Sequence, residues 1–456
     1  IMYSINDDVL RLILDFMSPE DIHGINSTNR VVYEKSMKSR YELLEITKRD
    51  KPTKVLLTHL CESDVGRYVK KVKIRPWLVH PHTNSPRSIT EKAIVRFMEV
   101  AVDPHYTRKT AEARLQKRLR KDTTRITTAF KSMSMLQEFE IDWDDTREFH
   151  PEFFRAFLAP PLASWQSHLT SLTVKVPLSL VFTLASVRLP YLQSFTFHFT
   201  TAGQPEQEIN HAHDGFLVFV NNLKDSLQSL TFTSTFTSQN LNLCYIFDHM
   251  GVFPSLRKIS LSIPFEGGHL PEPMSFVQFV MKHSKTLNHM DLFTSRCVMR
   301  WTPSRHSCFN WIQNILGSIP ERLPLLRGLG VALRPLRAPL TIVTQFLTMH
   351  PDIETLYLED RALETTQISQ LFPQFFAQPV VDILHFQAKV ESLTPDLLAY
   401  FAFKFPNLQT LKIECSQILL RGTLVSDFRN YNPQTNVVVS AALLVFRYSA
   451  KYRSLD

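Results

Sequence analysis

The chain has 456 residues, of which 44% are hydrophobic and 21% charged, and its formal net charge is +8. This length is ample for a large core, and no run of about 18 apolar residues occurs, so we expect no membrane-spanning segment and no membrane partner. Five scattered cysteines without a C-x-x-C pair indicate the cytoplasm or nucleus, and the 11 glycines form none of the motifs of phosphate, dinucleotide or nucleophile sites.

The first 45 residues predict a compact hook of three short helices. Asp7-Asp8 precede the first helix, and acidic residues favour a helix start. Ser18-Pro19 supplies a cap and a first-turn proline for the second helix, and the polar residues 26–29 separate the third. The first helix gathers four apolar side chains on one face: Val9, Ile13, Phe16 and Met17.

Residues 46–128 predict one repeat unit that is interrupted by an insertion. The stretch Tyr41 to Thr47 before it is helix-like, and a strand is expected from Val69 to Ile74. Prolines crowd between Arg75 and Ser88, which indicates an exposed loop.

The insertion continues into the most charged stretch of the chain, residues 108–125, with eight lysines and arginines against two acidic residues. These charges surround the stretch instead of forming one face, so a solvated helix is the default expectation. A phosphate-binding arm for nucleic acid or a phosphorylated partner is the alternative, since such clusters neutralise phosphates. The residues of this basic arm are Arg108, Lys109, Arg114, Lys117, Arg118 and Lys121.

An apolar pattern, Leu-x-x-Leu-x-Leu with other apolar residues allowed, recurs through residues 129–420. Its last two positions stand two apart, the period at which a strand sends side chains to one face. Successive middle positions are 23 to 39 residues apart, which fits a strand plus a helix per unit. We therefore predict an α/β solenoid of about ten to eleven irregular strand–helix units, followed by a C-terminal cap and tail at residues 421–456. The copies are Leu136/Phe139/Ile141, Leu169/Leu172/Val174, Leu192/Phe195/Phe197, Leu227/Leu230/Phe232, Leu256/Ile259/Leu261, Leu287/Met290/Leu292, Leu326/Leu329/Val331, Ile353/Leu356/Leu358, Val381/Leu384/Phe386 and Leu408/Leu411/Ile413, with an outlying earlier copy at Val69/Val72/Ile74.

These units resemble leucine-rich repeats, and the hook in front of them resembles an F-box. The features that match the F-box are the acidic pair, the run from Val9 to Met17, the Ser18-Pro19-Glu20-Asp21-Ile22 hinge and the third helix. Ile5-Asn6 stands where the motif usually opens with Leu-Pro. The order of hook and repeats is the layout of the F-box family, including its fungal members. A plain helical cap over the first repeat is the other interpretation of the hook.

The resemblance implies that the hook binds the Skp adaptor of a cullin-RING ubiquitin ligase and that the solenoid presents a protein for ubiquitin transfer. The ligase chemistry would then reside in other subunits, so we expect no enzyme and no cofactor. The alternative is a binding scaffold outside ubiquitin transfer, associated with nucleic acid or chromatin through residues 108–125. The adaptor-binding residues would be Ile5, Val9, Ile13, Phe16, Met17, Pro19, Ile22 and Val31.

The substrate would lie on the open face of the strands, where the residues flanking the apolar slots point. The early strands offer an acidic end, the central ones offer the hydroxyls Thr196, Thr231 and Ser260, and the later ones an aromatic, histidine-bearing end. Such a face would suit a protein or peptide with a basic segment and an apolar anchor. The candidate residues are Glu138, Glu140, Asp142, His289, Asp291, Phe293, Thr355, Tyr357, Glu359, Ile383 and His385.

No metal site is expected. His80-x-His82 and His211-x-His213 fall in expected loops and have no cysteine or carboxylate at metal-site spacing nearby.

Overall fold

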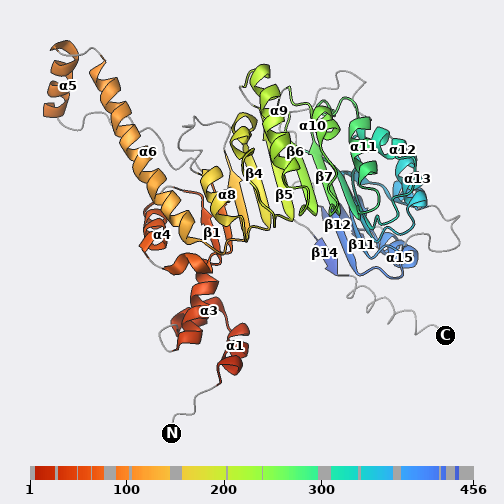
Figure 1. Ribbon diagram of the computed structural model, residues 1–456. Coiled ribbons are helices and arrows are strands. Elements are labelled where there is room, and N and C mark those ends of the chain that lie inside the picture. The colour runs from red at the N-terminus through yellow and green to blue at the C-terminus, as the bar shows by residue number, and fades with distance from the viewer. Residues whose placement is uncertain are drawn as a thin grey trace, which may run out of the picture. The chain divides into compact units, whose positions relative to one another are not determined.

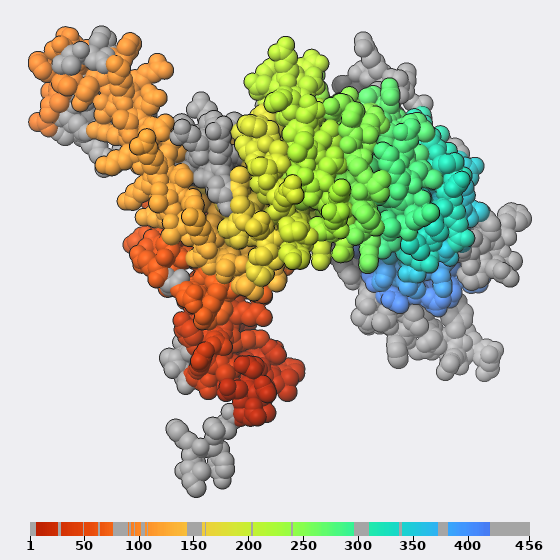
Figure 2. Space-filling view, in the orientation of Figure 1, coloured from red at the N-terminus to blue at the C-terminus, as the bar shows by residue number. Residues whose placement is uncertain are grey.

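The computed structural model describes residues 6–25, 29–48, 50–62, 64–75, 89–101, 105–143, 157–201, 204–238, 240–295, 310–336, 340–372, 382–420, 423–427 and 437–440. The chain, coloured by residue number in Figures 1 and 2, divides into two compact units. The first unit is Ile1–Gln193 with Asp214–Leu223, and the second is Ser194–His213 with Lys224–Asp456. Of the expectations above, the proline-crowded loop and His80-x-His82 lie outside the described residues.

The first unit carries the hook and four parallel strands in the order β1-β2-β3-β4. The three hook helices are confirmed, and Asn6, Ser18 and Asn29 cap them, each accepting a hydrogen bond from a backbone N–H of its helix. The elements are α1 (Asp7–Asp15), α2 (Pro19–Gly24), α3 (Arg30–Tyr41), β1 (Leu43–Ile46), α4 (Lys51–Glu62), the 3₁₀-helix η1 (Asp64–Tyr68), β2 (Lys71–Ile74), α5 (Ile89–Ala101), α6 (Tyr106–Ser132), β3 (Glu138–Asp142), α8 (Ala159–Trp165), β4 (Ser171–Pro177) and the 3₁₀-helix η2 (Leu178–Leu184).

The second unit carries eight parallel strands in chain order from β5 to β12. Helices alternate with most of them and lie to one side of the sheet (Figure 1). The elements are β5 (Ser194–Thr200), β6 (Ser229–Ser234), α10 (Leu243–His249), β7 (Lys258–Ile263), α11 (Met274–Lys282), β8 (His289–Thr294), α12 (Trp311–Ser318), β9 (Gly328–Ala332), α13 (Thr341–Met349), β10 (Thr355–Leu363), α14 (Thr365–Leu371), β11 (His385–Leu393), α15 (Pro395–Lys404), β12 (Thr410–Leu420), β13 (Thr423–Asp427) and β14 (Val437–Ser440), while α9 (Glu206–Asn221) contributes to both units.

The repeat pattern sets the register of both sheets. The middle apolar positions of neighbouring units pair directly, as Val72 does with Phe139 and Phe139 with Leu172. In the second unit the same alignment runs from Phe195 to Leu411 through every strand between them. The apolar positions are buried between strand and helix, and each repeat therefore hides its apolar edge against the next. The fold is a leucine-rich-repeat-like α/β solenoid, as predicted.

The last parallel strand does not leave its outer edge bare. β13 pairs antiparallel with residues Gln417–Leu420 of β12, and β14 pairs antiparallel with residues Thr410–Ile413. An unpaired strand edge would invite association with other chains, so part of the predicted C-terminal cap covers this edge. The remainder of that cap lies outside the described residues.

Three sequence-based expectations about secondary structure were wrong. The helix-like stretch Tyr41 to Thr47 contains strand β1, which adds a repeat before the expected first one. In the ninth copy the buried positions are Ile383, Phe386 and Ala388, two residues later than expected. The predicted loop around His211-x-His213 is part of helix α9.

Candidate binding surfaces

The hook has its own small core. Leu14 of α1, Ile22 of α2 and Val31 and Val32 of α3 are buried together, with Leu10 and Met17 packed against them. The far end of α3 is buried as well, through Met37 and Tyr41, where that helix packs against η1. The hook is therefore fixed to the first repeats by α3.

Helix α1 carries a second apolar stripe on its outer side. Val9, Leu12, Ile13 and Phe16 follow the spacing i, i+3, i+4, i+7 of one helical face, and all four are exposed. Phe16 has 86% of its surface accessible. A helix that is apolar on two sides has a buried side and a side left for a partner. We call these four residues the hook stripe.

The structure places the expected adaptor residues in three groups. Val9, Ile13, Phe16 and Pro19 are exposed, and Met17 is half-buried. Ile22 and Val31 were wrongly expected on the surface, because they form the hook's core. Ile5 lies outside the described residues. The sequence reasoning missed Leu12, although its i+3 spacing from Val9 marks it.

On the open face of the first unit, the expected acidic residues of β3 are paired with cations from neighbouring strands. Lys71 Nζ lies 2.7 Å from Glu138 Oε1, and Lys73 Nζ lies 2.6 Å from Glu140 Oε1. Asp142 forms ion pairs with Arg75, whose Nε lies 2.9 Å from Oδ2, and with Lys175, whose Nζ lies 3.1 Å from Oδ1. The face therefore shows alternating charges in place of the acidic end that was expected, because the register sets β2 lysines opposite β3 glutamates.

On the open face of the second unit, side chains of β8 lean over two glycines of β9. A Cβ at Gly328 would overlap the His289 ring, and one at Gly330 would overlap Asp291 and Phe293. Because β9 has no side chain there, the rings of His289 and Tyr357 approach to 6.2 Å between centroids across the intervening strand. The structure thus brings together four of the expected site residues, which we call the β8–β10 cluster: His289, Asp291, Phe293 and Tyr357.

Asp291 is the polar centre of this cluster and is only 3% exposed. Its Oδ1 lies 3.0 Å from His289 Nε2, and its Oδ2 lies 3.0 Å from Lys258 Nζ. Burial alone would raise the pKa of Asp291, but the hydrogen bond and charge of His289 and the charge of Lys258 outweigh it and lower this pKa. The carboxylate therefore stays ionised and holds the side chains of His289 and Lys258 in place.

No protein-family model matches the chain, and no curated protein matches its sequence. Among solved structures, it is similar to the leucine-rich-repeat-containing protein LegL7 of Legionella pneumophila, at 12% identity and a TM-score of 0.38 over 84% of this chain and 93% of that chain. The fold assignment depends on the strand order and buried positions described above. Repeat solenoids present extended concave surfaces.

A bulge in β10 adds a group of poorly compensated charges beside the cluster. The register shifts between Leu358 and Leu363, and Asp360 takes a positive φ of 72°, which is uncommon outside glycine. Burial raises the pKa of Glu359, with the neighbouring Asp360 adding to it, and burial also raises the pKa of Asp360. Within the described part of the chain, the buried Nε and Nη2 of Arg361 have no hydrogen-bond partner. Such perturbed groups are typical of binding sites.

The remaining expected face residues lie as follows. Thr355, Tyr357 and His385 are half-buried on the open face, as are Thr196 and Thr231, and Ser260 is buried. Ile383 was wrongly placed on this face, because it is the first buried position of its repeat. The shifted register brings in two residues that were missed, Gln387 and Lys389, which bind Glu359 at 3.2 Å and Glu414 at 2.8 Å.

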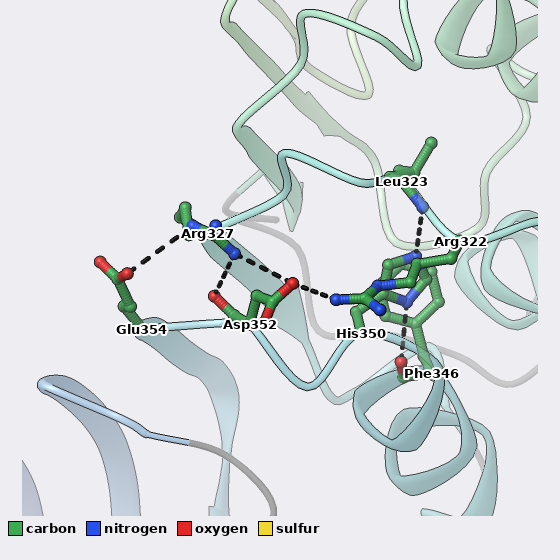
Figure 3. Close-up of polar contacts among 7 residues, drawn as sticks. All are labelled: Arg322, Leu323, Arg327, Phe346, His350, Asp352 and Glu354. Carbon is green, nitrogen blue, oxygen red and sulfur yellow. Dashed lines mark hydrogen bonds and ion pairs between the residues drawn. The ribbon is translucent and has the colours of Figure 1, made fainter.

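Two buried histidines tie successive repeats together. His350 follows α13, and its Nε2 accepts a hydrogen bond from the backbone N–H of Leu323 at 3.0 Å, so its Nδ1 carries the proton and donates to the Phe346 carbonyl at 2.8 Å (Figure 3). His283 makes the same two bonds with Phe253 and Phe279. Burial lowers the pKa of both histidines, which keeps the rings neutral. Their role is structural.

An ion-pair group lies beside the His350 connection. Asp352 pairs with Arg322 and with Arg327, whose Nη1 lies 3.2 Å from Asp352 Oδ2, and Arg327 Nε lies 3.7 Å from Glu354 (Figure 3). The hydrogen bond from Arg327 and the charge of Arg322 lower the pKa of Asp352. This group is exposed and links the turns before β9 and β10.

The basic arm is a helix, as expected, but its charges are more ordered than the sequence suggested. Arg114, Lys117, Arg118, Lys121 and Arg125 lie on α6 at the spacing i, i+3, i+4, i+7, i+11, which is one helical face. The first four of these and Arg108 and Lys109 are exposed or half-buried. Arg108, Lys109 and Arg120 lie on other sides of the helix, so the charges do surround it, with five of the eight on one face.

The described residues contain no group of three histidine, cysteine or acidic side chains that could hold a metal ion. Within the same ranges, every helix is too short or too polar to cross a bilayer.

Proposed function

We propose that the chain is the substrate-recognition subunit of a Skp-cullin-F-box type ubiquitin ligase. The hook binds the Skp adaptor through the hook stripe, and the strand faces of the solenoid hold a protein substrate. The ubiquitin transfer itself is carried out by the other subunits. The protein is therefore a binding component without a catalytic residue of its own.

The hook stripe is the observation that supports this proposal over a plain helical cap. A cap needs one apolar side, which it buries against the first repeat, and α3 already serves that purpose through Met37 and Tyr41. The outer side of α1 is not needed for packing, because the contacts of α1 within the hook are made by Leu10 and Leu14 on its other side. An uncovered stripe that includes a phenylalanine at 86% exposure matches a partner's apolar groove.

The proposed substrate surface is the β8–β10 cluster with its neighbours. Tyr357 and Phe293 supply aromatic contact area, which dominates many interfaces, and Glu359 supplies a carboxylate for a basic residue of the substrate. His385 lies on the next strand of the same face. The β3 residues Glu138, Glu140 and Asp142 remain candidate substrate contacts, because a basic residue of the substrate could replace their present lysine and arginine partners.

Co-purification with purified Skp adaptor and cullin tests the adaptor part. The full chain should retain both proteins, and a Phe16→Glu variant should bind the adaptor at least tenfold more weakly, because burial of such a side chain contributes about 1.5–3 kcal/mol. Phe403→Glu is the matched control, since Phe403 is a similarly exposed phenylalanine, at 80%, on α15. Equal retention of both variants, or no retention of the full chain, would remove the ligase assignment.

The substrate part needs a different test. Alanine at Tyr357 and Phe293 should weaken capture of substrates that the full chain retains, while the unfolding midpoint stays unchanged. Capture that is unaffected by both substitutions would move the substrate site off this face.

A binding scaffold outside ubiquitin transfer is the second candidate, and the single basic face of α6 favours it. Such a face fits the phosphates of nucleic acid, whose binding weakens steeply with salt. Salt-sensitive retention of duplex DNA that is lost in an Arg114→Glu, Lys117→Glu variant would support this candidate. Retention of the adaptor with no DNA retention would exclude it.

A further inference from the structure

Helix α5 carries an exposed and mainly apolar stripe, in which Thr90 at the start of the helix is the one polar residue among those whose side chains are described. Ala93, Ile94, Phe97, Val100 and Ala101 fall within roughly a third of the helix circumference at helical spacing. All five are exposed, and Ile94, Phe97 and Val100 have 60%, 67% and 84% of their surfaces accessible. Single exposed apolar residues are common, but a continuous stripe along a 13-residue helix marks an interaction surface. We call these five residues the α5 stripe.

The α5 stripe is not covered by the rest of its own unit. Among the described elements, α5 packs appreciably only against α6, and the two helices lie side by side near the start of α6 (Figures 1 and 2). Of the two half-buried residues of α5, Glu99 lies on the side opposite the stripe and Met98 lies at its edge, next to Ile94 and Ala101. The five side chains of the stripe remain exposed beside the contact that holds α5.

The neighbouring helix adds a strong positive charge. The far half of α6 is fixed to the first unit by Leu119, Ile126 and Phe130, which are buried where it packs against α4 and α8. The basic face from Arg114 to Arg125 lies on the other side of that helix, as the helical spacing requires. The segment 108–125 has eight basic and two acidic residues, a net charge of 8 − 2 = +6.

We propose that α5 and the basic face of α6 together bind the surface of an anionic lipid membrane. An amphipathic helix lies in the interface with its apolar stripe among the acyl chains, and lysines and arginines beside it attract anionic headgroups. The strength of such binding grows with the apolar area buried and with the attraction to anionic lipids, and this arm supplies both contributions. No spanning helix is required, so the absence of a long apolar run in the sequence does not bear on this surface.

The chemistry of the arm favours this partner over the others. The five residues of the α5 stripe are apolar, and Thr90 is the one hydrogen-bonding side chain described on that face of the helix, which suits an apolar partner that needs no specific pattern of hydrogen bonds. A second copy of the chain would bring two segments of charge +6 together, and these repel each other. Nucleic acid would use the basic face of α6 but gives no role to Ile94, Phe97 and Val100. The inference is independent of the proposed ligase function.

Vesicle co-sedimentation of the full chain tests the proposal with four proteins. These are the unchanged chain, an Ile94→Asp, Phe97→Asp variant, a Lys117→Glu, Lys121→Glu variant, and Phe403→Asp as a control for adding an acid at an exposed phenylalanine. The substituted residues are exposed, so the fold should persist, which circular dichroism checks. The probes are vesicles of phosphatidylcholine alone and of phosphatidylcholine with phosphatidylserine.

We expect the unchanged chain and Phe403→Asp to bind the phosphatidylserine vesicles and to bind phosphatidylcholine vesicles at least tenfold more weakly. Both arm variants should lose at least tenfold in binding to the anionic vesicles, and added salt should weaken the unchanged chain. Absence of binding by the unchanged chain would overturn the proposal. Two other results would also overturn it. One is vesicle binding that survives in the Ile94→Asp, Phe97→Asp variant, together with duplex DNA binding that the Lys117→Glu, Lys121→Glu variant loses. The other is a dimer of the unchanged chain in solution that the Ile94→Asp, Phe97→Asp variant no longer forms.

Discussion

Replacement of His350 by alanine should destabilise the second unit, because this side chain connects α13 with the turn before β9. The substitution removes the acceptor of the Leu323 N–H and the donor to the Phe346 carbonyl. Leu323 and Phe346 are buried, so water does not easily replace either bond. The Phe346 carbonyl keeps its bond from the backbone N–H of residue 350, at 3.1 Å, so only the Leu323 N–H is left unpaired. A buried polar group that loses its partner costs about 1–3 kcal/mol, and this is the expected loss in the free energy of unfolding.

His249→Ala is a close control for this prediction. His249 follows the same pattern at the end of α10, with its Nδ1 2.8 Å from the Tyr245 carbonyl and its ring 4.3 Å from the Tyr245 ring. It is exposed, so solvent can take over the lost bond, and the expected change is below about 1 kcal/mol.

Urea denaturation of both variants and hydrogen exchange at the Leu323 amide provide the assay. The Leu323 N–H should exchange slowly in the unchanged chain and in His249→Ala, and much faster in His350→Ala. A loss below about 1 kcal/mol in His350→Ala, with unchanged exchange at Leu323, would refute the reasoning that these histidines hold adjacent repeats together.

Three further predictions concern pH, backbone space and surface charge. Burial lowers the pKa of His269 from 6.5 to about 4; the unfolded chain then binds this proton at higher pH than the folded chain, so stability is greatest above pH 6.5 and falls by about 3 kcal/mol as the pH drops toward 4. When the free energy of unfolding is measured by denaturation at each pH in that range, it should fall less steeply with decreasing pH in His269→Gln than in the unchanged chain. Gly330→Ala should displace Asp291 and cost about 1–3 kcal/mol, whereas Gly268→Ala, whose Cβ would meet no atom within 4 Å, should change the unfolding midpoint little; equal effects would contradict the account of the glycines. Glu140→Ala removes a half-exposed ion pair and should cost about 0.2–1 kcal/mol at low salt and less at high salt, with a salt-independent loss as the contrary result.

The sheet could be predicted from the sequence because its signal is local. Apolar residues two apart after a turn define a strand with one buried face, and most of the triplets named from the sequence are buried. Strand β1 was missed although Tyr41, Leu44 and Ile46 carry the same spacing, because Tyr41 is also the last residue of α3. A residue shared between two patterns cannot be assigned from periodicity alone.

The ninth repeat shows a second limit of local patterns. Two overlapping triplets compete there, and the one that ends in Ala388 is correct. Alanine is a weak indicator of a buried position in a search for large apolar residues, so Ala388 was overlooked. Only the pairing of Phe386 with Leu356 and Leu411 decides the register, and such pairing is not visible in one segment.

The binding surfaces were harder to predict because they depend on which side of each element is covered. Both stripes of α1 are apolar, and the sequence does not say that Leu14 faces inward while Phe16 faces outward. In the same way, Glu138 and Glu140 looked like an acidic surface until the register set Lys71 and Lys73 beside them. The role of the β9 glycines, which leave room for side chains of β8, also becomes visible only when the neighbouring strands are placed.

Hydrogen exchange of the full chain with and without purified Skp adaptor tests the proposed function most directly. The account predicts slower exchange of the α1 amides, Asp7–Asp15, when the adaptor is present, with the strands of the second unit unchanged. An α1 that exchanges at the same rate with a saturating amount of adaptor would contradict the proposal that the hook stripe is its binding surface.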